Sequence, residues 1–263
     1  MVHSSQAGVH PRLERVLARH RDAPWQGTLH PPTVRAFAQL PALIERERRP
    51  LVLDSGCGTG ESTRRLARAF PDALVLGVDK SAARLARTGA TGFPHREDNA
   101  VWLRADLATF WRLVLEARWP VERHYLLYPN PWPKPGHLQR RWHGHPVFPC
   151  LLALGGRLEL RTNWTVYAQE FAWSAARMTG QAITPRELPP GDAMTPFERK
   201  YRASGHRLYS QEHIDLINRN LSPQQKVDLV RGMWQVACAD DRIHHHEEAL
   251  IRRLADLIAE AGR

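Results

Sequence analysis

Residues 51–60 read Leu-Val-Leu-Asp-Ser-Gly-Cys-Gly-Thr-Gly, and this stretch decides the fold of the chain. The apolar run 51–53 is typical of a short buried strand, and residues 61–70 after the glycines have a helical pattern that Pro71 ends. Glycines are needed between them because the chain must turn tightly and let a ligand approach the backbone. A strand, a glycine-rich turn and a helix place backbone N–H groups against a nucleotide-like ligand.

Alternating strand and helix patterns extend in both directions from this turn. Further strands are expected at residues 73–79, 101–106, 124–128 and 157–162, with an edge strand near 206–209. Helices are expected at residues 10–20, 33–47, 81–87, 107–117 and 166–178. This alternation predicts an α/β fold in which helices cover both faces of a mostly parallel central sheet.

Composition divides the chain into three parts: a basic helical extension (residues 1–50), the α/β domain (51–210) and a helical tail (211–263). The net charge of the whole chain is +10, but the tail holds seven basic and nine acidic side chains. Residues 1–210 therefore carry a net charge of +12. An excess of this size attracts polyanions through counterion release, and it predicts a nucleic-acid partner.

The compartment follows from what the sequence lacks. Three cysteines, Cys57, Cys150 and Cys238, are odd in number and far apart, which fits a reducing environment. The sequence contains no run of about eighteen uncharged apolar residues, so no membrane span is predicted. The first residues lack the basic-then-apolar layout of a secretory signal. We therefore expect a cytoplasmic protein.

Acidic residues end the second and third predicted strands. Asp79 follows the glycine turn by about twenty residues, where a carboxylate can accept hydrogen bonds from both ribose hydroxyls. Asp106 ends the next strand. The spacing Gly56-x-Gly58-x-Gly60 differs from the G-x-G-x-x-G fingerprint of dinucleotide-binding proteins, which disfavours NAD.

The second informative motif is residues 128–134, Tyr-Pro-Asn-Pro-Trp-Pro-Lys, after the fourth predicted strand. Its aromatic and polar groups are suited to a flat polar ring, and Trp132 could stack on a purine with about 1–3 kcal/mol. A core position for Trp132 is the competing interpretation. With the glycine turn, this motif predicts methyl transfer to a nucleobase.

With these motifs in place, the chain resembles the bacterial tRNA (guanine-N7)-methyltransferase family over residues 10–210. The resemblance is carried, in the family's order, by residues 53–60, 77–79, 128–134, 139–141, 155–156, 162–164 and 195–198. It implies a Rossmann-like class I methyltransferase fold with S-adenosylmethionine as the cofactor. It also implies methyl transfer to N7 of a guanine in the variable loop of tRNA.

The resemblance assigns a role to each motif residue on the cofactor side. Asp54 is expected to face the amino-acid end of the cofactor, and Asp106 to read the adenine amino group. The remaining expected cofactor contacts are Gly56, Gly58, Gly60, Asp79 and Asn130.

On the acceptor side, guanine N7 carries a free lone pair, so catalysis is chiefly a matter of placement against the methyl group. Glu198 is expected to accept hydrogen bonds from the guanine N1–H and amino group, with a surface salt bridge to Arg199 or Lys200 as the alternative. The resemblance implies Asn130, Trp132 and Lys134 as catalytic residues. The expected substrate contacts are Lys134, Arg140, Arg141, Asn163, Thr195, Phe197 and Glu198.

Two positions depart from the family pattern, since Asn130 and Asn163 stand where the family has aspartate. Alkylation at N7 makes the ring cationic, and a neighbouring carboxylate would stabilise the transition state. The Asn-Pro-Trp segment also resembles the Asn-Pro-Pro-aromatic signature of methyltransferases that act on exocyclic base amines. Methylation of another RNA position and a catalytically weak tRNA-binding protein are therefore the alternatives.

The tail has its own helical pattern, with Ser222 and Gln225 forming a capping box. Residues 236–248 resemble part of a tellurite-resistance TerB-like domain. The segment is shorter than such a domain needs to fold alone, which predicts docking of the tail on the main domain or on a partner protein. The histidines at 137, 143 and 145 are expected to pack or to contact phosphate, and those at 244–246 to lie near helix-capping acids, so no metal is predicted. The sequence leaves open whether the protein is a monomer or a homodimer.

Overall fold

The computed structural model describes residues 4–22, 25 and 27–216. All but the first six residues of the predicted tail lie outside this range, together with its capping box, its TerB-like segment and its histidine run. The predictions for them stay predictions.

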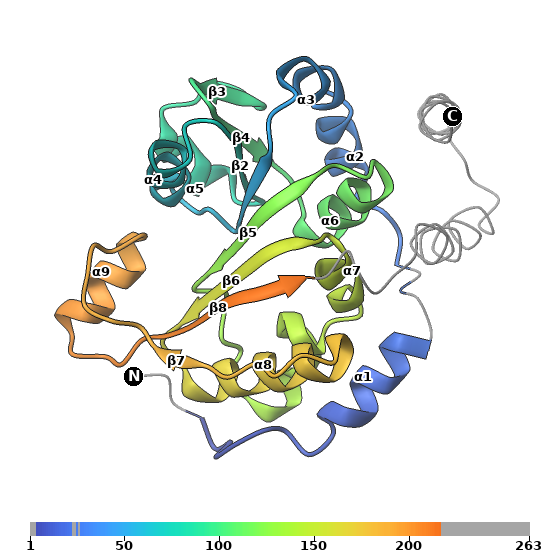
Figure 1. Ribbon diagram of the computed structural model, residues 1–263, viewed down its shortest axis with the longest axis vertical. Helices are drawn as coiled ribbons and strands as arrows, with labels where there is room; N and C mark the ends of the chain where they lie inside the picture. Colours follow the sequence, from blue (N-terminus) through green and yellow to red (C-terminus); the bar gives the residue numbers. More distant parts are fainter. Residues whose placement is uncertain (1–3, 23–24, 26, 217–263) are drawn as a thin grey trace.

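A central sheet of eight strands organises the described residues, in the order β3-β4-β2-β1-β5-β6-β8-β7 (Figure 1). The strands are β1 Leu51–Ser55, β2 Leu74–Asp79, β3 His95–Glu97, β4 Ala100–Arg104, β5 Val121–Leu127, β6 Gly156–Thr162, β7 Arg186–Glu187 and β8 Tyr209–Leu216. The central strands from β4 to β6 pair in parallel, whereas β3, β7 and β8 pair antiparallel at the edges. The predicted mostly parallel α/β fold is confirmed.

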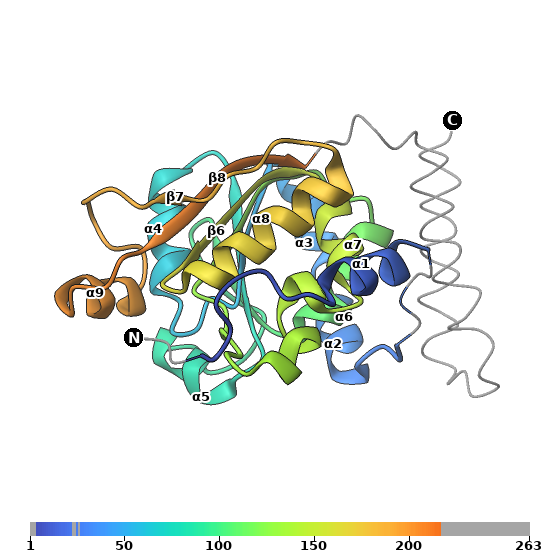
Figure 2. The same cartoon turned by 90° about the horizontal axis from the view of Figure 1, so that it is seen from below.

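Helices cover both faces of this sheet. They are α1 Leu13–Asp22, α2 Pro31–Phe37, α3 Pro41–Glu47, α4 Glu61–Ala69, α5 Ala82–Leu85, α6 Leu107–Glu116, α7 Phe148–Ala153, α8 Thr165–Thr179 and α9 Pro196–Ala203, with 3-10 turns η1 Ala86–Thr88, η2 Pro135–Arg140 and η3 Trp142–Gly144. Figures 1 and 2 show α9 at the same end of the molecule as α4 and α5, away from α1, α2 and α7.

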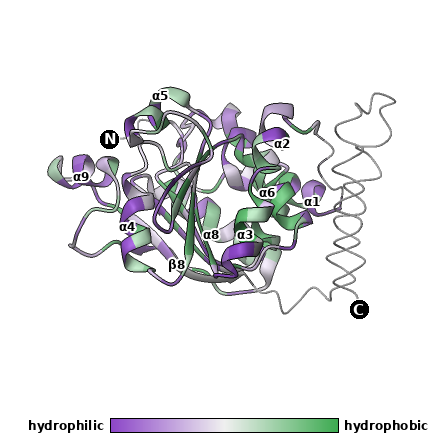
Figure 3. Ribbon diagram, turned by 90° about the horizontal axis from the view of Figure 1, so that it is seen from above, coloured by the Kyte–Doolittle hydropathy of each residue, from purple (hydrophilic) through white to green (hydrophobic). Residues whose placement is uncertain are grey.

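The two faces follow from the alternation of side chains along each strand. On β1, Leu51 and Leu53 join the larger core, which is built with α1, α6 and α8, whereas Val52 joins the smaller core under α4 and α5. Helix α6 is buried along almost its whole length, and Figure 3 shows it as predominantly hydrophobic. Leu13 and Leu17 of α1 also lie in the larger core, so the predicted N-terminal extension packs as part of the domain.

Some predicted elements differ from the observed ones. The single helix expected at residues 33–47 is two helices, because Pro41 has no N–H to continue the first helix and begins the second instead. Strands β3 and β7 and helices α7 and α9 were not predicted. The edge strand begins at Tyr209 and continues to Leu216, past the predicted domain boundary at residue 210.

The order of the strands positions the functional site. From β1 the chain adds β2 and β4 on one side and then β5 and β6 on the other, so β1 pairs in parallel with both β2 and β5. Ligands of open α/β sheets bind where the strand order reverses, at the carboxyl ends of the strands. The loops after β1 and β5 leave neighbouring strands at this point.

Candidate cofactor and acceptor site

The loop after β1 owes its shape to its glycines. Gly56, Gly58 and Gly60 have φ angles of 81°, 59° and 76°, in the left-handed region that residues with side chains disfavour. Gly60 is also the N-cap of α4, where a Cβ atom would collide with the Trp102 indole. At Gly56 and Gly58 an added Cβ would meet other side chains only at 3.9–4.0 Å, which leaves room for a ligand.

Asp54 lies buried beneath this loop. Its Oδ2 atom accepts hydrogen bonds from the hydroxyls of Ser62 and Thr63, both at 2.7 Å, whereas Oδ1 is buried without a partner. Burial raises the pKa of Asp54 to about 6, against the opposing effect of the two hydroxyls. An unpaired buried acceptor is costly, so a donor from a ligand that reaches Oδ1 would be stabilising.

Asp79 closes β2 and supports the same loop. Its carboxylate accepts the Gly58 N–H at 3.0 Å and the Ser81 N–H at 2.8 Å, and the Arg84 guanidinium lies 3.4 Å away. Asp106 instead caps α6, where it accepts the backbone N–H of Thr109 at 3.1 Å. Neither carboxylate lines the cavity described below: Asp79 is tied to the glycine loop and Asp106 to the start of α6.

The acceptor loop, residues 128–134, follows β5. Tyr128 and Trp132 have φ angles of 53° and 47°, which are rare for bulky side chains. Each such residue costs on the order of 1–3 kcal/mol and persists only where surrounding contacts enforce it. One of these contacts is the hydrogen bond from the Tyr128 N–H to the Arg161 carbonyl oxygen on β6, at 2.8 Å.

A cavity of about 810 Å³ joins the two loops. Its walls come from the glycine loop, the acceptor loop, the start of α4 and the start of α9. Of the residues predicted from the sequence, it brings together Gly56, Gly58, Asn130, Asn163, Thr195 and Phe197. These loops are far apart in the sequence and meet because β1 and β5 are neighbours.

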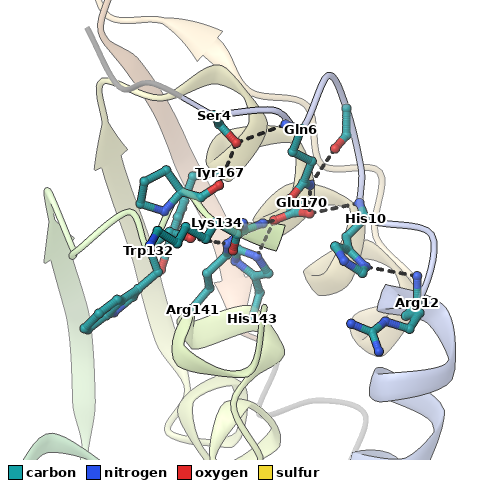
Figure 4. Close-up of polar contacts among 12 residues, drawn as sticks. Ser4, Gln6, His10, Arg12, Trp132, Lys134, Arg141, His143, Tyr167 and Glu170 are labelled. Atoms are coloured by element: carbon teal, nitrogen blue, oxygen red, sulfur yellow. Dashed lines mark hydrogen bonds and ion pairs between the residues drawn. The ribbon is translucent and has the colours of Figure 1, made fainter. Parts of the chain in front are cut away.

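Trp132 and Lys134 do not line this cavity. The Trp132 ring lies 4.9 Å from the guanidinium of Arg140 and 5.6 Å from the ring of His137. Figure 4 shows the indole pointing away from the buried residues behind the loop. Because the residue is half-exposed, a position in the core is contradicted, whereas stacking of Trp132 on the acceptor base stays a prediction.

Helix α9 supplies an aromatic wall instead. Thr195 caps the helix by accepting the backbone N–H of Glu198 at 3.0 Å. The exposed ring of Phe197 stacks on Tyr201 with centroids 6.3 Å apart, and Tyr201 stacks on His206 at 5.3 Å. Phe197 was predicted from the sequence and Tyr201 was not, although a spacing of four residues on a helix places both on the same face.

Glu198 is placed differently from the prediction. Its side chain is fully buried and forms ion pairs with Arg161 at 3.1 Å and Arg202 at 3.0 Å. It also accepts the Met194 N–H at 3.3 Å and does not line the cavity. Its hydrogen-bonding capacity is occupied within the fold, so the predicted reading of a guanine edge by Glu198 is contradicted. The alternative, an ion pair, is observed with other partners and in the interior.

The two neighbouring arginines of the basic run at residues 139–141 differ in their exposure to solvent. Arg140 is exposed and lies over Trp132, available to a polyanion. Arg141 is fully buried and ion-paired with Glu170 at 2.5 Å. A guanidinium sealed from solvent cannot contact an RNA backbone, so the predicted role of Arg141 is wrong, whereas that of Arg140 stays a prediction.

The excess of positive charge was predicted from composition, but its position in the fold was not. Six basic side chains line the cavity and form what we call the basic rim: Arg64, Arg65, Arg68, Arg84, Arg87 and Lys200. Arg64 pairs with Glu97 at 2.8 Å, whereas Arg68 and Arg87 have no acidic partner among the described residues. The signal was present in the spacing of the arginines along the helix expected at residues 61–70.

The described part of the chain holds no group of three or more His, Cys, Asp or Glu side chains that could bind a metal ion. Within the same residues, no helix has the length and apolarity to cross a membrane. Cys57 lines the cavity, but burial raises the pKa of its thiol and keeps it protonated.

Comparison with known families gives two matches. The model described as "Putative methyltransferase" matches residues 48–211, more than half of the chain. The chain belongs to this methyltransferase family. A second model, described as "Tellurite resistance protein TerB", matches residues 176–260. The predicted TerB-like resemblance is confirmed, and the match begins earlier than expected, within α8.

Similar curated proteins include several tRNA (guanine-N(7)-)-methyltransferases. The one from Treponema pallidum (strain Nichols) is 29% identical over 163 residues, 61% of this chain and 65% of its own length. The one from Thermus thermophilus is 34% identical over 172 residues, 64% of this chain and 54% of its own length. This chain thus spans less than two thirds of the length of these two relatives.

Among solved structures, the 16S rRNA (adenine(1408)-N(1))-methyltransferase from Catenulisporales acidiphilia is similar with a TM-score of 0.51. It is 18% identical, and the similarity covers 68% of this chain and 92% of that one. At this identity the likeness shows a shared fold. The predicted class I methyltransferase fold is confirmed.

Proposed function

We propose that this methyltransferase transfers a methyl group from S-adenosylmethionine to N7 of a guanine in the variable loop of tRNA. The observation that carries the proposal is the cavity that joins the glycine loop after β1 to the acceptor loop after β5. The names of the relatives from Treponema and Thermus, tRNA (guanine-N(7)-)-methyltransferase, support tRNA as the substrate and guanine N7 as the acceptor atom. A tRNA substrate implies a cytoplasmic protein.

The glycine side of the cavity fits S-adenosylmethionine. Asp54 Oδ1 is a buried acceptor without a partner, suited to a protonated amino group, and the Asp79 carboxylate beneath Gly58 is suited to ribose hydroxyls. The backbone of Gly56 and Gly58 leaves space for close approach. When bound, the cofactor supplies an electrophilic methyl group on a sulfonium.

The acceptor side requires placement more than acid–base chemistry. Because guanine N7 has a free lone pair, the residues have only to hold the ring in line and exclude water. The aromatic surface of Phe197 and Tyr201 suits a stacked base, a contact worth about 1–3 kcal/mol in comparable sites. Asn130, exposed on the acceptor loop, offers an amide to the ring edge.

The basic rim supports an RNA substrate over a small one. Arg68, Arg87 and Lys200 add positive charge around a cavity that would already hold a cationic donor. Phosphates of a bound strand would offset this charge and release counterions, so affinity should fall steeply with salt. A small neutral substrate would gain little from the same rim.

A second candidate is methylation of an exocyclic base amine. The observation that favours it is that Asn130 and Asn163 both line the cavity where carboxylates are expected for N7 attack. An amide can accept a hydrogen bond from an exocyclic amine, and it supplies no negative charge to a cationic N7 product.

The test is incubation of the full chain with a tRNA transcript and isotope-labelled S-adenosylmethionine, followed by mass spectrometry of the nucleosides. Labelled 7-methylguanosine is the expected product. Labelled N-methylated adenosine, cytidine or guanosine at an exocyclic amine would favour the second candidate. Binding of both cofactor and tRNA without any labelled nucleoside would identify a tRNA-binding protein instead.

A further inference from the structure

One carboxylate holds the acceptor loop from behind. Glu170 on α8 is fully buried, and Figure 4 shows it at the meeting point of contacts from other parts of the chain. Its Oε2 atom accepts hydrogen bonds from Arg141 Nη1 at 2.5 Å and from His143 Nε2 at 2.8 Å. Its Oε1 atom accepts from Gln6 Nε2 at 2.6 Å and from the backbone N–H of His10 at 2.9 Å.

These contacts define the charge of the cluster. Burial alone would raise the pKa of Glu170, but the contacts with His143 and Arg141 outweigh it and hold the pKa at about 2. Burial lowers the pKa of His143 against the opposing effect of the Glu170 carboxylate, and the Arg141 guanidinium is the ion-pair partner of Glu170. Breaking a buried pair leaves an uncompensated charge, so the arrangement is strongly held.

Arg141 connects Glu170 to the backbone of the acceptor loop. Its Nε donates to the Trp132 carbonyl oxygen at 3.2 Å and its Nη2 to the Lys134 carbonyl oxygen at 3.4 Å. Its guanidinium also lies 4.8 Å from the ring of Trp164. Because the guanidinium is a rigid fork, the orientation that Glu170 imposes on one edge fixes the other. The left-handed conformation of Trp132 lies at this contact.

The N-terminal strap, residues 4–10, reaches the same loop. The Ser4 hydroxyl donates to the Pro133 carbonyl oxygen at 2.6 Å and accepts the Gln6 N–H at 3.1 Å. Gln6 and His10 then end on Glu170. The strap and the acceptor loop therefore share one carboxylate and touch each other directly.

We propose that Glu170 is a positioning residue for methyl transfer: through Arg141 it sets the acceptor loop that carries Asn130, and through Gln6 and His10 it ties the strap to that loop. The effect on turnover rests on the proposed function, whereas the positioning itself can be measured without RNA. The glycine loop is held by Asp79, and the start of α4 behind it is held by Asp54, so the two sides of the cavity should respond separately.

The decisive variants are Glu170→Gln and Glu170→Asp in the full chain, with Glu116→Gln on α6 as a matched control of another buried glutamate. Glu170→Gln should lower kcat with tRNA by about 100-fold, the scale of a small misplacement of reacting groups, and leave the Kd for S-adenosylmethionine within about twofold. Hydrogen exchange should accelerate in residues 4–10 and 128–134. Glu170→Asp keeps the charge and should restore part of kcat.

A parallel fall in cofactor affinity and kcat would mean a merely structural role and overturn the proposal. Unchanged exchange in the strap and the acceptor loop would overturn it too. A wild-type chain that methylates no nucleoside would overturn the proposed function instead, and the exchange measurement would still decide the positioning.

Gln6→Ala keeps the proposal testable if Glu170→Gln does not fold, because Gln6 is half-exposed. It should accelerate exchange in the strap and lower kcat/KM for tRNA by about tenfold, the equivalent of its hydrogen bond to Glu170, without lowering the melting temperature appreciably. The other hydrogen bond of the Gln6 side chain, to the Gly8 carbonyl oxygen, stays within the strap. Gln39→Ala, which removes an exposed glutamine between α2 and α3, is the control. If the two variants behave alike in exchange and in turnover, the strap has no part in positioning.

Discussion

The glycine loop and the acceptor loop face each other across the cavity, yet they keep their shapes by opposite means. The glycine loop takes left-handed backbone at Gly56, Gly58 and Gly60, where that conformation costs little. The acceptor loop takes it at Tyr128 and Trp132, where it is unfavourable. The first loop is encoded by its own residues, and the second depends on contacts from elsewhere in the chain.

The buried carboxylates behind the two loops differ in the same way. Asp54 bonds hydroxyls eight and nine residues away in the sequence, has an unpaired oxygen, and has its pKa raised to about 6. Glu170 engages both oxygens with distant partners and has its pKa lowered to about 2. On the cofactor side, one carboxylate oxygen of Asp54 therefore still lacks a hydrogen-bond donor that a ligand could supply. Behind the acceptor loop, both carboxylate oxygens of Glu170 already have donors from the protein.

The largest expected effect is a difference in unfolding free energy between substitutions of two adjacent arginines. Arg141→Ala should reduce the free energy of unfolding by about 3–5 kcal/mol, because it leaves the buried carboxylate of Glu170 without its charge partner. Arg140→Ala, at an exposed position, should change it by less than about 0.5 kcal/mol. Urea unfolding of both variants tests this, and similar losses for the two would break the comparison.

The second effect is a pH dependence on the cofactor side. The folded-state pKa of Asp54 is raised from 3.8 to about 6, so its contribution to stability is full below pH 3.8 and is lost as pH rises through 6. Glu170, lowered from 4.5 to about 2, behaves in the opposite sense and contributes fully above pH 4.5. Relative to Asp54→Asn, the wild type should lose about 2.5 kcal/mol of unfolding free energy between about pH 4 and pH 7.

Urea unfolding as a function of pH measures this difference. A constant gap between wild type and Asp54→Asn over that range would show that burial does not control the Asp54 carboxyl.

The third effect compares two left-handed glycines. Gly60→Ala should cost about 2 kcal/mol more than Gly89→Ala, since both have positive φ but only a Cβ at Gly60 meets the Trp102 indole. Calorimetric titration with S-adenosylmethionine should show weakened binding for Gly60→Ala alone. Equal losses of stability would mean that the crowding at Gly60 is relieved by a shift of Trp102.

The smallest expected effect concerns the missing carboxylate of the acceptor loop. Asn130→Asp should raise turnover about tenfold if the lack of negative charge near a cationic product limits N7 attack, an effect of about 1.4 kcal/mol. Single-turnover kinetics with tRNA measure it, and Asn163→Asp provides the second site for comparison. An unchanged or lower rate for Asn130→Asp would favour the exocyclic-amine candidate.

Prediction from sequence succeeded where the signal is local. Strands such as β1 and β2 are short apolar runs, and the glycines and Pro71 mark where they turn or where helices end. The error at residues 33–47 came from treating Pro41 as a helical residue inside a periodic pattern, although proline more often begins a helix.

The roles of Arg141 and Glu198 could not be predicted in this way. Both lie in polar, charged segments that are typical of a surface. In the fold each side chain is buried and forms an ion pair with an oppositely charged residue more than twenty positions away in the sequence. Whether a charged side chain faces solvent or a partner depends on which elements pack over it, and no local pattern records that.

The sequence by itself determined the order of strands and helices, the glycine turn, the carboxylates after the strands and the excess of positive charge. These features follow from residue type and spacing over a few residues. Only the tertiary structure decided that α9 offers Phe197 and Tyr201 to the cavity and that basic side chains of α4, α5, η1 and α9 form its rim. It also decided that Glu170 ties the strap to the acceptor loop. The physical reason is that side-chain burial and pairing are properties of the packed elements together.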